Sequence, residues 1–451
     1  MSQARLTSCI PLPLEHKTLV NVIEKAKDWA LMHGVGMRDK KHFNKDVIQI
    51  APFVLLPSPF PRTEFDKAIE LQPILNELMH KVAHDDCFLE STLQNALQVD
   101  EFTASLYDIW VKVRNEGVTQ PVSLGMLRSD IMLESRCPHT ENQCAKHSPY
   151  CSWKQVEINS IASGFGHLGP VSREIQSYVL KQLGHGDLIK NMPENKALSG
   201  LCAGITEAYD LFGVPTAVIL FVVEEVSYNI CDQRFHEFEI AEKRPDIQIH
   251  RKTLNEIFEE THLNDKKQLI LDGCQVAVVY YRSGYEPAQY PSTKEWDARL
   301  RVERSTRCSR RWLRPACWRS SWGGGAATSR VRDIFTGLYS LDFDETGERA
   351  VEMALADAEK FVLKPQREGG GNNVYGAEVP GYVVRPGSPV PPPVVDLVSE
   401  LGIFGVIIGT KEKICYNRQV GHMLRTKLAD ANEGGVAAGL GALDSPYLVD
   451  A

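Results

Sequence analysis

The chain lacks the features that would place it in several common protein classes. Its longest apolar run, residues 216–223, has the length of a strand and is too short to span a membrane. The first 17 residues hold only a short apolar stretch with two prolines, so we expect no signal peptide. The 11 cysteines are odd in number and lack framework spacing, which argues against a disulfide scaffold. We therefore expect a cytoplasmic protein with no membrane partner.

Basic residues are not in excess, because the formal net charge is −8. Nucleic-acid backbones require a basic surface, so we expect no nucleic-acid partner. Residues 304–332 depart from this composition, since they are rich in Arg and Trp and contain no acidic residue. Arg and Trp can together hold phosphates and stack bases, so contact with nucleic acid through this segment stays open. The composition also fits translation in a wrong reading frame, and we treat the segment as aberrant.

A polar stretch over residues 137–151 combines cysteine and histidine, which are both zinc ligands. Its candidate ligands are Cys137, His139, Cys144, His147 and Cys151. The closely spaced cysteine pair of most zinc sites is missing from it. A metal site and a solvated surface insertion both stay open.

The hydrophobic pattern predicts a mixed α/β fold. Apolar residues recur every three or four positions in 63–83 and 100–117, which is typical of amphipathic helices. Beyond residue 120 apolar runs of strand length alternate with helical stretches. The expected strands are 153–163, 216–223, 275–281, 360–365 and 401–409, and 255–262 is an expected helix.

The glycine-rich sequence GFGHLG at 164–169 follows the first of these strands. It matches the G-x-G-x-x-G pattern of dinucleotide-binding loops, but the preceding strand carries Glu157 and Asn159 where such strands are apolar. Close approach of the backbone to some other ligand is the favoured interpretation. Residues two apart on a strand face the same side, so Glu157 and Asn159 together suit Mg²⁺ or simply form a solvated face.

Two further segments suggest binding of phosphate groups. In KFVLKPQREGGGNNVYG, the run 369–371 offers backbone N–H groups, Lys364 a positive charge and Glu368 a carboxylate for Mg²⁺. This is not a Walker A loop, and a flexible glycine hinge is the alternative. In the second segment Arg425 and Lys427 precede a glycine pair, which again indicates an anion site.

Taken together, these motifs resemble the eukaryotic glutathione synthetase family. The matching sequences include LGMLRSD, KQVEINSIASGFGHL, NICDQR, VVYYRSGYEPAQY, FVLKPQREGGGNNVYG, LRTK and GGVAAG. The resemblance implies an ATP-grasp fold with a helical N-terminal part, an α/β substrate-binding domain and a lid, and it implies a homodimer. It also implies ligation of γ-glutamylcysteine to glycine with ATP as co-substrate and one or two Mg²⁺ ions per subunit. The implied parts are 1–208 and 416–451 for the catalytic domain, 209–303 for the substrate domain, 304–332 as the aberrant segment and 333–415 for a shortened lid.

The resemblance assigns roles to individual positions. The metal ligands would be Glu157, Asn159 and Glu368, and the catalytic cations would be Lys364 and Arg425. ATP would contact Glu157, Lys364, Pro365, Gln366, Arg367, Glu368, Gly369, Gly370, Gly371, Asn372, Asn373, Tyr375, Glu400, Lys427 and Glu433. The peptide substrate would contact Arg128, Ile161, Ala162, Ser163, Gly164, Asn229, Gln233, Arg282, Ser283, Gly284, Tyr285, Arg425, Val436 and Ala437. Arg128 and Arg282 are also expected at strand ends, where sites form in α/β proteins.

The chain departs from the family pattern in two larger places. The segment 304–332 replaces a helix whose lysine contacts ATP, and that lysine has no counterpart. After Tyr375 part of the lid is missing, including a strand that lines the adenine. Ser227 and Tyr228 also differ from the family's residues before Asn229. The alternative to an active ligase is therefore an impaired splice form or pseudoenzyme that acts at most as a dimer partner.

Overall fold

The computed structural model mixes helices and strands throughout, which confirms the α/β class. It describes residues 6–134, 150, 152–305, 308–309, 326–337, 339, 341, 344–357, 361, 379–429 and 441–450. Most of the cysteine-rich stretch 137–151, most of the aberrant segment 304–332 and most of the expected strand 360–365 lie outside the described residues. Within those ranges no helix has the length and apolarity of a bilayer span. The domain boundaries expected from the sequence stay predictions.

The centre of the fold is an antiparallel group of long strands. In spatial order it runs β6 (Ser152–Asn159), β5 (Ser123–Glu134), β15 (Val395–Gly409), β16 (Ile414–Leu428) and β17 (Gly441–Asp444). Three short strands extend it: β3 (Phe53–Val54) beside β17, β14 (Val383–Val384) beside β3, and β13 (Val379–Gly381) beside β15. Because β6 runs antiparallel to β5, the glycine-rich loop after β6 does not open a parallel βαβ unit, which argues against the dinucleotide interpretation.

A second group of strands is parallel. β7 (Val218–Val222) lies between β8 (Gln248–Lys252) and β11 (Cys274–Tyr281), which confirms two of the expected strands. β10 (Leu269–Leu271) and β9 (Thr261–Leu263) continue this group in antiparallel fashion. The short β12 (Cys308–Ser309) pairs with both β11 and β5, so the two groups share one sheet. Two small sheets pair β1 (Gly36–Met37) with β2 (Gln49–Ile50) and β4 (Ser58–Pro61) with β18 (Pro446–Val449).

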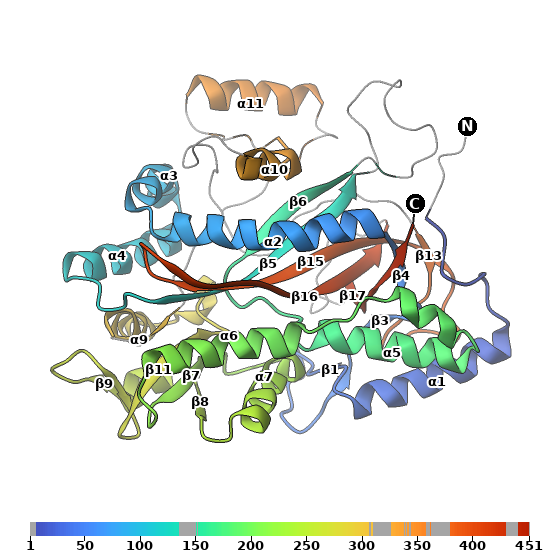
Figure 1. Cartoon of the computed structure of the whole chain (residues 1–451), viewed down its shortest axis with the longest axis horizontal. Helices are drawn as coiled ribbons and strands as arrows, with labels where there is room; N and C mark the ends of the chain where they lie inside the picture. Colours follow the sequence, from blue (N-terminus) through green and yellow to red (C-terminus); the bar gives the residue numbers. More distant parts are fainter. Residues whose placement is uncertain are drawn as a thin grey trace.

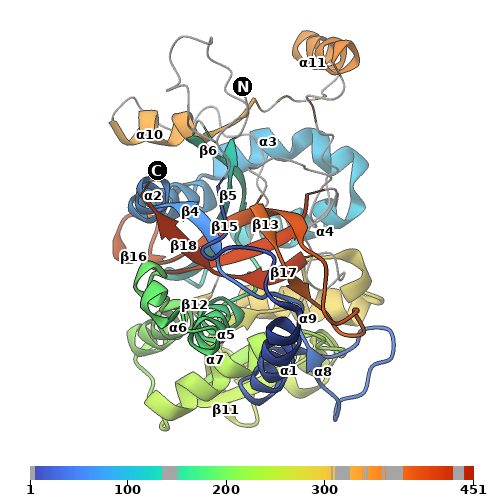
Figure 2. The same ribbon diagram turned by 90° about the vertical axis from the view of Figure 1, so that its right-hand side faces the viewer.

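Helices cover both faces of the central strands (Figure 1). α2 (Arg62–Ala83) lies on one face, and α5 (Leu168–Gln182) and α6 (Ala197–Phe212) lie on the other. α1 (His16–Met32) packs on α5, and α7 (Ile230–Lys243) packs on α6. In both views α10 (Ala326–Ile334) and α11 (Glu345–Ala356) lie beyond α2, on the side away from α1 (Figure 2). The remaining helices are α3 (Asp86–Val99), α4 (Glu101–Asn115), η1 (Gly186–Asn191), α8 (Leu254–Glu260), η2 (Pro287–Gln289) and α9 (Thr293–Arg304).

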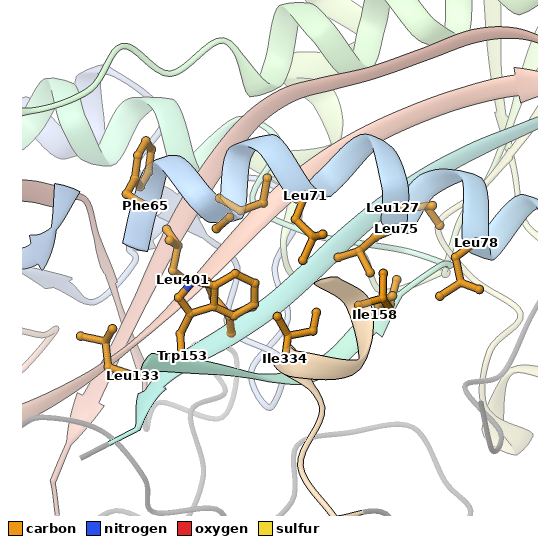
Figure 3. Close-up of a cluster of buried hydrophobic side chains, with 14 of the residues drawn as sticks. Phe65, Leu71, Leu75, Leu78, Leu127, Leu133, Trp153, Ile158, Ile334 and Leu401 are labelled. Carbon is orange, nitrogen blue, oxygen red and sulfur yellow. The ribbon is translucent and has the colours of Figure 1, made fainter. Parts of the chain in front are cut away.

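The apolar stripe expected on α2 is buried against the sheet. Leu71, Leu75 and Leu78 are all at most 5% exposed and point toward the strands in Figure 3. They join a cluster that includes Leu127 of β5 and Leu401 of β15. Each such leucine contributes roughly 1.5–3 kcal/mol by leaving water. This layer holds α2 against the strands that carry the polar groups described below.

Side-chain alternation along β5 decides which residues can form a site. Leu127 and Ile131 belong to the cluster under α2, whereas Leu124 and Met126 belong to the cluster under α6. Even-numbered positions of this strand therefore face away from α2, and Arg128 is one of them. The expectation of a strand end at Arg128 was wrong, because β5 pairs on both edges and continues to Glu134. Arg282 does follow β11 directly, as expected.

Candidate active site

Charged and amide side chains from four neighbouring strands gather on the sheet face turned away from α2. They are Arg128 and Asp130 of β5, Glu157 and Asn159 of β6, Glu400 of β15, and Arg425 and Lys427 of β16. Strand pairing places Asn159 opposite Arg128, Glu157 opposite Asp130, and Arg425 opposite Glu400. Side chains opposite one another on a sheet lie within reach of each other. The sheet thus joins residues that are up to 299 positions apart, from 128 to 427, in one polar cluster.

Asp130 is the central acceptor of this cluster. Its two carboxylate oxygens accept hydrogen bonds from Nε and Nη2 of Arg128 at 2.6 and 2.7 Å. The second oxygen also accepts from Nδ2 of Asn159 at 2.9 Å. Asp130 is fully buried, and a bidentate contact of this kind orients a guanidinium firmly. Sequence reasoning missed Asp130, although its position two residues after Arg128 places it on the same face.

Glu400 and Arg425 form the second ion pair of the cluster. Nη2 of Arg425 donates to Oε1 of Glu400 at 2.6 Å. Burial raises the pKa of Glu400 to about 7, although Arg425 opposes this shift. Burial also lowers the pKa of Lys427, two residues further along β16. The predicted nucleotide and substrate contacts on β15 and β16 therefore lie side by side in a partly dehydrated environment, where electrostatic interactions are strong.

Glu157 and Asn159 are arranged as expected for ligands of Mg²⁺. Nδ2 of Asn159 donates to Oε1 of Glu157 at 3.2 Å as well as to Asp130, so its amide oxygen is the atom left for a cation. Carboxylate and amide oxygens are suitable ligands for this ion. The third expected ligand, Glu368, lies outside the described residues. Among the described side chains no group of three or more His, Cys, Asp or Glu could hold a metal.

The loop between β6 and α5 carries several of the predicted substrate contacts. Its carbonyl oxygens accept from two arginines: Gly164 from Nη1 of Arg128 at 3.1 Å, and Ser163 from Nη1 of Arg282 at 2.9 Å. Ala162 and Phe165 have positive φ angles, of 50° and 76°, which non-glycine residues adopt rarely. Ile161 packs in an apolar cluster with β7 and β11. The loop is thus tied to both strand groups of the sheet.

Asp232 at the start of α7 holds this loop in place. Its carboxylate accepts backbone N–H bonds from Phe165, His167 and Leu168 at 2.9 to 3.2 Å, and it lies 3.5 Å from Nη2 of Arg282. Burial would raise the pKa of Asp232, but Arg282 and the other donors outweigh burial and lower it. Sequence reasoning missed this residue too, because these partners lie at least 50 positions away along the chain.

The remaining described contacts predicted for the peptide substrate lie around the carboxyl ends of β7 and β11. Nε2 of Gln233 donates to Oδ1 of Asn229 at 2.5 Å. The hydroxyl of Tyr285 donates to Glu224 at 3.0 Å. Ser283 is buried, and Gly284 has a φ of 94° with its N–H bonded to Gln289 at 2.5 Å. Ligand sites form at such strand ends in open α/β sheets.

Several predicted site residues fall outside the part of the chain that the structure describes. Within the segment 364–375 they are Lys364, Pro365, Gln366, Arg367, Glu368, Gly369, Gly370, Gly371, Asn372, Asn373 and Tyr375, and near the C-terminus they are Glu433, Val436 and Ala437. Their assignments stay predictions.

Comparison with known proteins decides the family. The sequence matches the family described as eukaryotic glutathione synthase, ATP binding domain, over residues 16–388 and 380–448. The chain belongs to the eukaryotic glutathione synthase family. Glutathione synthetases of Homo sapiens and Xenopus laevis are each 37% identical to it, with 96% of the chain and 98% of each relative aligned. The chloroplastic glutathione synthetase of Arabidopsis thaliana is 30% identical over 97% of the chain and 86% of its own length.

A solved structure agrees with this membership of the glutathione synthase family at the level of the fold. A glutathione synthetase-like effector from Globodera pallida, in its apo form, superposes with a TM-score of 0.68 and 21% identity. The match covers 98% of this chain and all of that protein. The family match over residues 16–388 and 380–448 and this likeness of fold together confirm the ATP-grasp architecture expected from the sequence.

Proposed function

We propose that the chain joins γ-glutamylcysteine to glycine and converts ATP to ADP and phosphate, with glutathione as the product. The observation that carries this proposal is the polar cluster on β5, β6, β15 and β16. It combines cations for a dipeptide and phosphates with oxygen ligands for Mg²⁺, and it belongs to a chain that matches glutathione synthetases over almost its whole length.

The proposed reaction has two steps. The terminal carboxylate of the dipeptide attacks the γ-phosphorus of ATP, and the bond to the β-phosphate oxygen breaks to release ADP. The glycine amine then attacks the acyl carbon of the resulting acyl phosphate, loses a proton and expels inorganic phosphate. Chemistry of this kind depends on in-line positioning and neutralisation of charge more than on a protein nucleophile.

The described side chains supply these requirements. Arg128 and Arg282 are nearly fully buried, and both hold their guanidinium groups against the loop after β6. Nε of Arg282 is buried without a hydrogen-bond partner among the described residues, as is Nε of Arg425. Buried donors in this state favour an anionic ligand. Mg²⁺, held by Glu157, Asn159 and Glu368, would neutralise charge on the phosphates.

The direct test is to incubate the purified chain with ATP, Mg²⁺, γ-glutamylcysteine and glycine and to detect glutathione by mass spectrometry. We expect glutathione and ADP in equal amounts, and no product after chelation of Mg²⁺. Glu368→Gln should abolish turnover without lowering the melting temperature, because a neutral amide replaces a carboxylate ligand. Product formation by that variant at the wild-type rate would refute the metal assignment.

The competing proposal is an inactive relative that serves as a dimer partner. It follows from the loss of the family lysine in 304–332 and of part of the lid after Tyr375. Loss of one charge-stabilising donor lowers a rate by about 10²–10³, which a sensitive assay still detects. Calorimetric titration with ATP and Mg²⁺ separates the two cases: Mg²⁺-dependent binding favours the ligase, and no binding together with no product favours the inactive relative.

We also propose that the chain forms a homodimer in the cytoplasm. Both statements come from the resemblance to the family. Light scattering of the purified protein would give twice the mass of the chain, and a monomer mass at micromolar concentration would refute the dimer. Cell fractionation tests the location.

A further inference from the structure

Asp130 occupies a position that connects two halves of the proposed site. It lies on β5 between β15 and β6, opposite Gly402 on one side and Glu157 on the other. A Cβ atom at Gly402 would come within 2.9 Å of both Cδ of Arg128 and Oδ1 of Asp130. The missing side chain at Gly402 therefore leaves the space in which this ion pair fits.

The contacts of Asp130 determine how Arg128 presents its donors. A guanidinium has five N–H groups, and the described residues engage three of those on Arg128, two through Asp130 and one through the carbonyl of Gly164. One N–H on each terminal nitrogen is left for an anion such as a dipeptide carboxylate. Without the bidentate contact the guanidinium could rotate about its last side-chain bonds, and these two donors would lose their common direction.

Asp130 also determines which atom Asn159 offers. The amide nitrogen of Asn159 lies between the carboxylates of Asp130 and Glu157 and donates to both. The reversed amide would place its oxygen against two carboxylate oxygens, which is repulsive. Asp130 therefore keeps the amide oxygen of Asn159 free to act as a ligand. One buried carboxylate thus controls both a cation for the dipeptide and an oxygen for the metal.

We propose that Asp130 is a positioning residue that aligns Arg128 with the dipeptide and Asn159 with Mg²⁺, without touching either ligand itself. The proposal rests on the proposed function, because it assigns Asp130 a part in that reaction. It predicts that loss of the Asp130 carboxylate impairs two ligands at once. A contribution to folding alone would lower the stability and leave both ligand affinities unchanged.

The test compares Asp130→Asn with Ser129→Ala. An amide at position 130 keeps the size of the side chain but directs N–H groups toward either Arg128 or Asn159, which are themselves donors. Ser129 is the matched control, because it precedes Asp130 on β5, faces the other side of the strand and has a buried hydroxyl with no hydrogen-bond partner among the described residues. Both variants should be assayed at least 15 °C below their melting temperatures.

For Asp130→Asn we expect kcat/KM for γ-glutamylcysteine to fall by about 10²-fold, since small misplacements of reacting groups have effects of this size. The KM for glycine should change less than twofold. Two calorimetric titrations give readouts apart from activity: γ-glutamylcysteine alone, and a non-hydrolysable ATP analogue with Mg²⁺. Both should bind at least tenfold more weakly to Asp130→Asn, whereas Ser129→Ala should match the wild type in every assay.

Wild-type affinities for both ligands in a folded Asp130→Asn protein would overturn the proposal, and so would a loss confined to only one of them. If Asp130→Asn does not fold, Asp130→Glu decides, because it keeps the charge but is too long to hold both partners at the present distances. The same weakening of both ligands by Asp130→Glu supports the proposal, and wild-type affinities overturn it. Failure of the proposed function is a different result, namely a wild-type chain that makes no glutathione.

Discussion

Replacement of Asp232 by asparagine should destabilise the protein far more than an ordinary loss of one charge. Asp232 is fully buried and accepts three backbone N–H bonds from the loop and the first turn of α5. It is also the counter-ion of Arg282, which is only 3% exposed. The amide of Asp232→Asn would keep the volume but remove the charge, and its own N–H groups would face donors.

The size of the effect follows from these contacts. Removal of one partner of a buried ion pair costs about 3–5 kcal/mol, because the other charge stays buried without compensation. At about 2.1 cal/mol/K per residue, the unfolding entropy of a 451-residue chain is about 0.95 kcal/mol/K. The melting temperature should therefore fall by about 3–5 °C. Differential scanning calorimetry measures this shift, and Glu242→Gln, at an exposed position of the same helix, is the control.

The dependence on pH provides a second check. The pKa of Asp232 is lowered on folding by Arg282 and the backbone donors, which outweigh burial. Its stabilising effect is therefore present above the unfolded-state pKa of about 3.9 and is lost as the pH falls through the lower folded-state value. The difference between wild type and Asp232→Asn should be largest near neutral pH and should shrink below about pH 4. A melting temperature within 1 °C of the wild type at pH 7 would refute this reasoning.

Three further predictions concern packing and buried polar groups. Gly402→Ala would place a Cβ atom 2.9 Å from Cδ of Arg128, so it should lower the stability by roughly 1–3 kcal/mol and raise the KM for γ-glutamylcysteine. Chemical denaturation measures the change in stability, and steady-state kinetics measure the change in KM. Burial lowers the pKa of His422 to about 3, so between pH 7 and pH 5 only the unfolded state takes up a proton at this residue, and the wild type loses stability. His422→Phe should reduce that loss by roughly 2 kcal/mol. Urea unfolding at the two pH values measures the loss for each protein, and an equal loss in wild type and variant would contradict the prediction. Asn76→Ala should cost roughly 2–4 kcal/mol, since it removes the 2.9 Å bond from α2 to Asn417 and leaves the fully buried Nε2 of Gln72 without the Asn76 oxygen that accepts from it; an unchanged urea midpoint would contradict this.

The sequence alone determined the class of the fold and much of the chemistry. A period of 3.6 in the apolar residues predicted α2, because burial of one face imposes that spacing, and continuous apolar runs of strand length predicted β7 and β11. The alternation of side chains along a strand placed Glu157 and Asn159 on one face, and their hydrogen bond bears this out. The motifs around Arg128, Lys364 and Arg425 were specific enough to indicate the family, which the comparisons confirmed.

Only the tertiary structure decided which of these residues meet. Strand order placed β5 between β6 and β15, and this order depends on pairing between segments hundreds of residues apart, which no local pattern encodes. The length of β5 and the position of Arg128 within it were missed for the same reason. Asp130 and Asp232 were missed because a carboxylate shows its role only through its partners. The sequence alone thus indicates which side chains can bind ligands. The ion pairs that orient those side chains depend on contacts that form only in the folded chain.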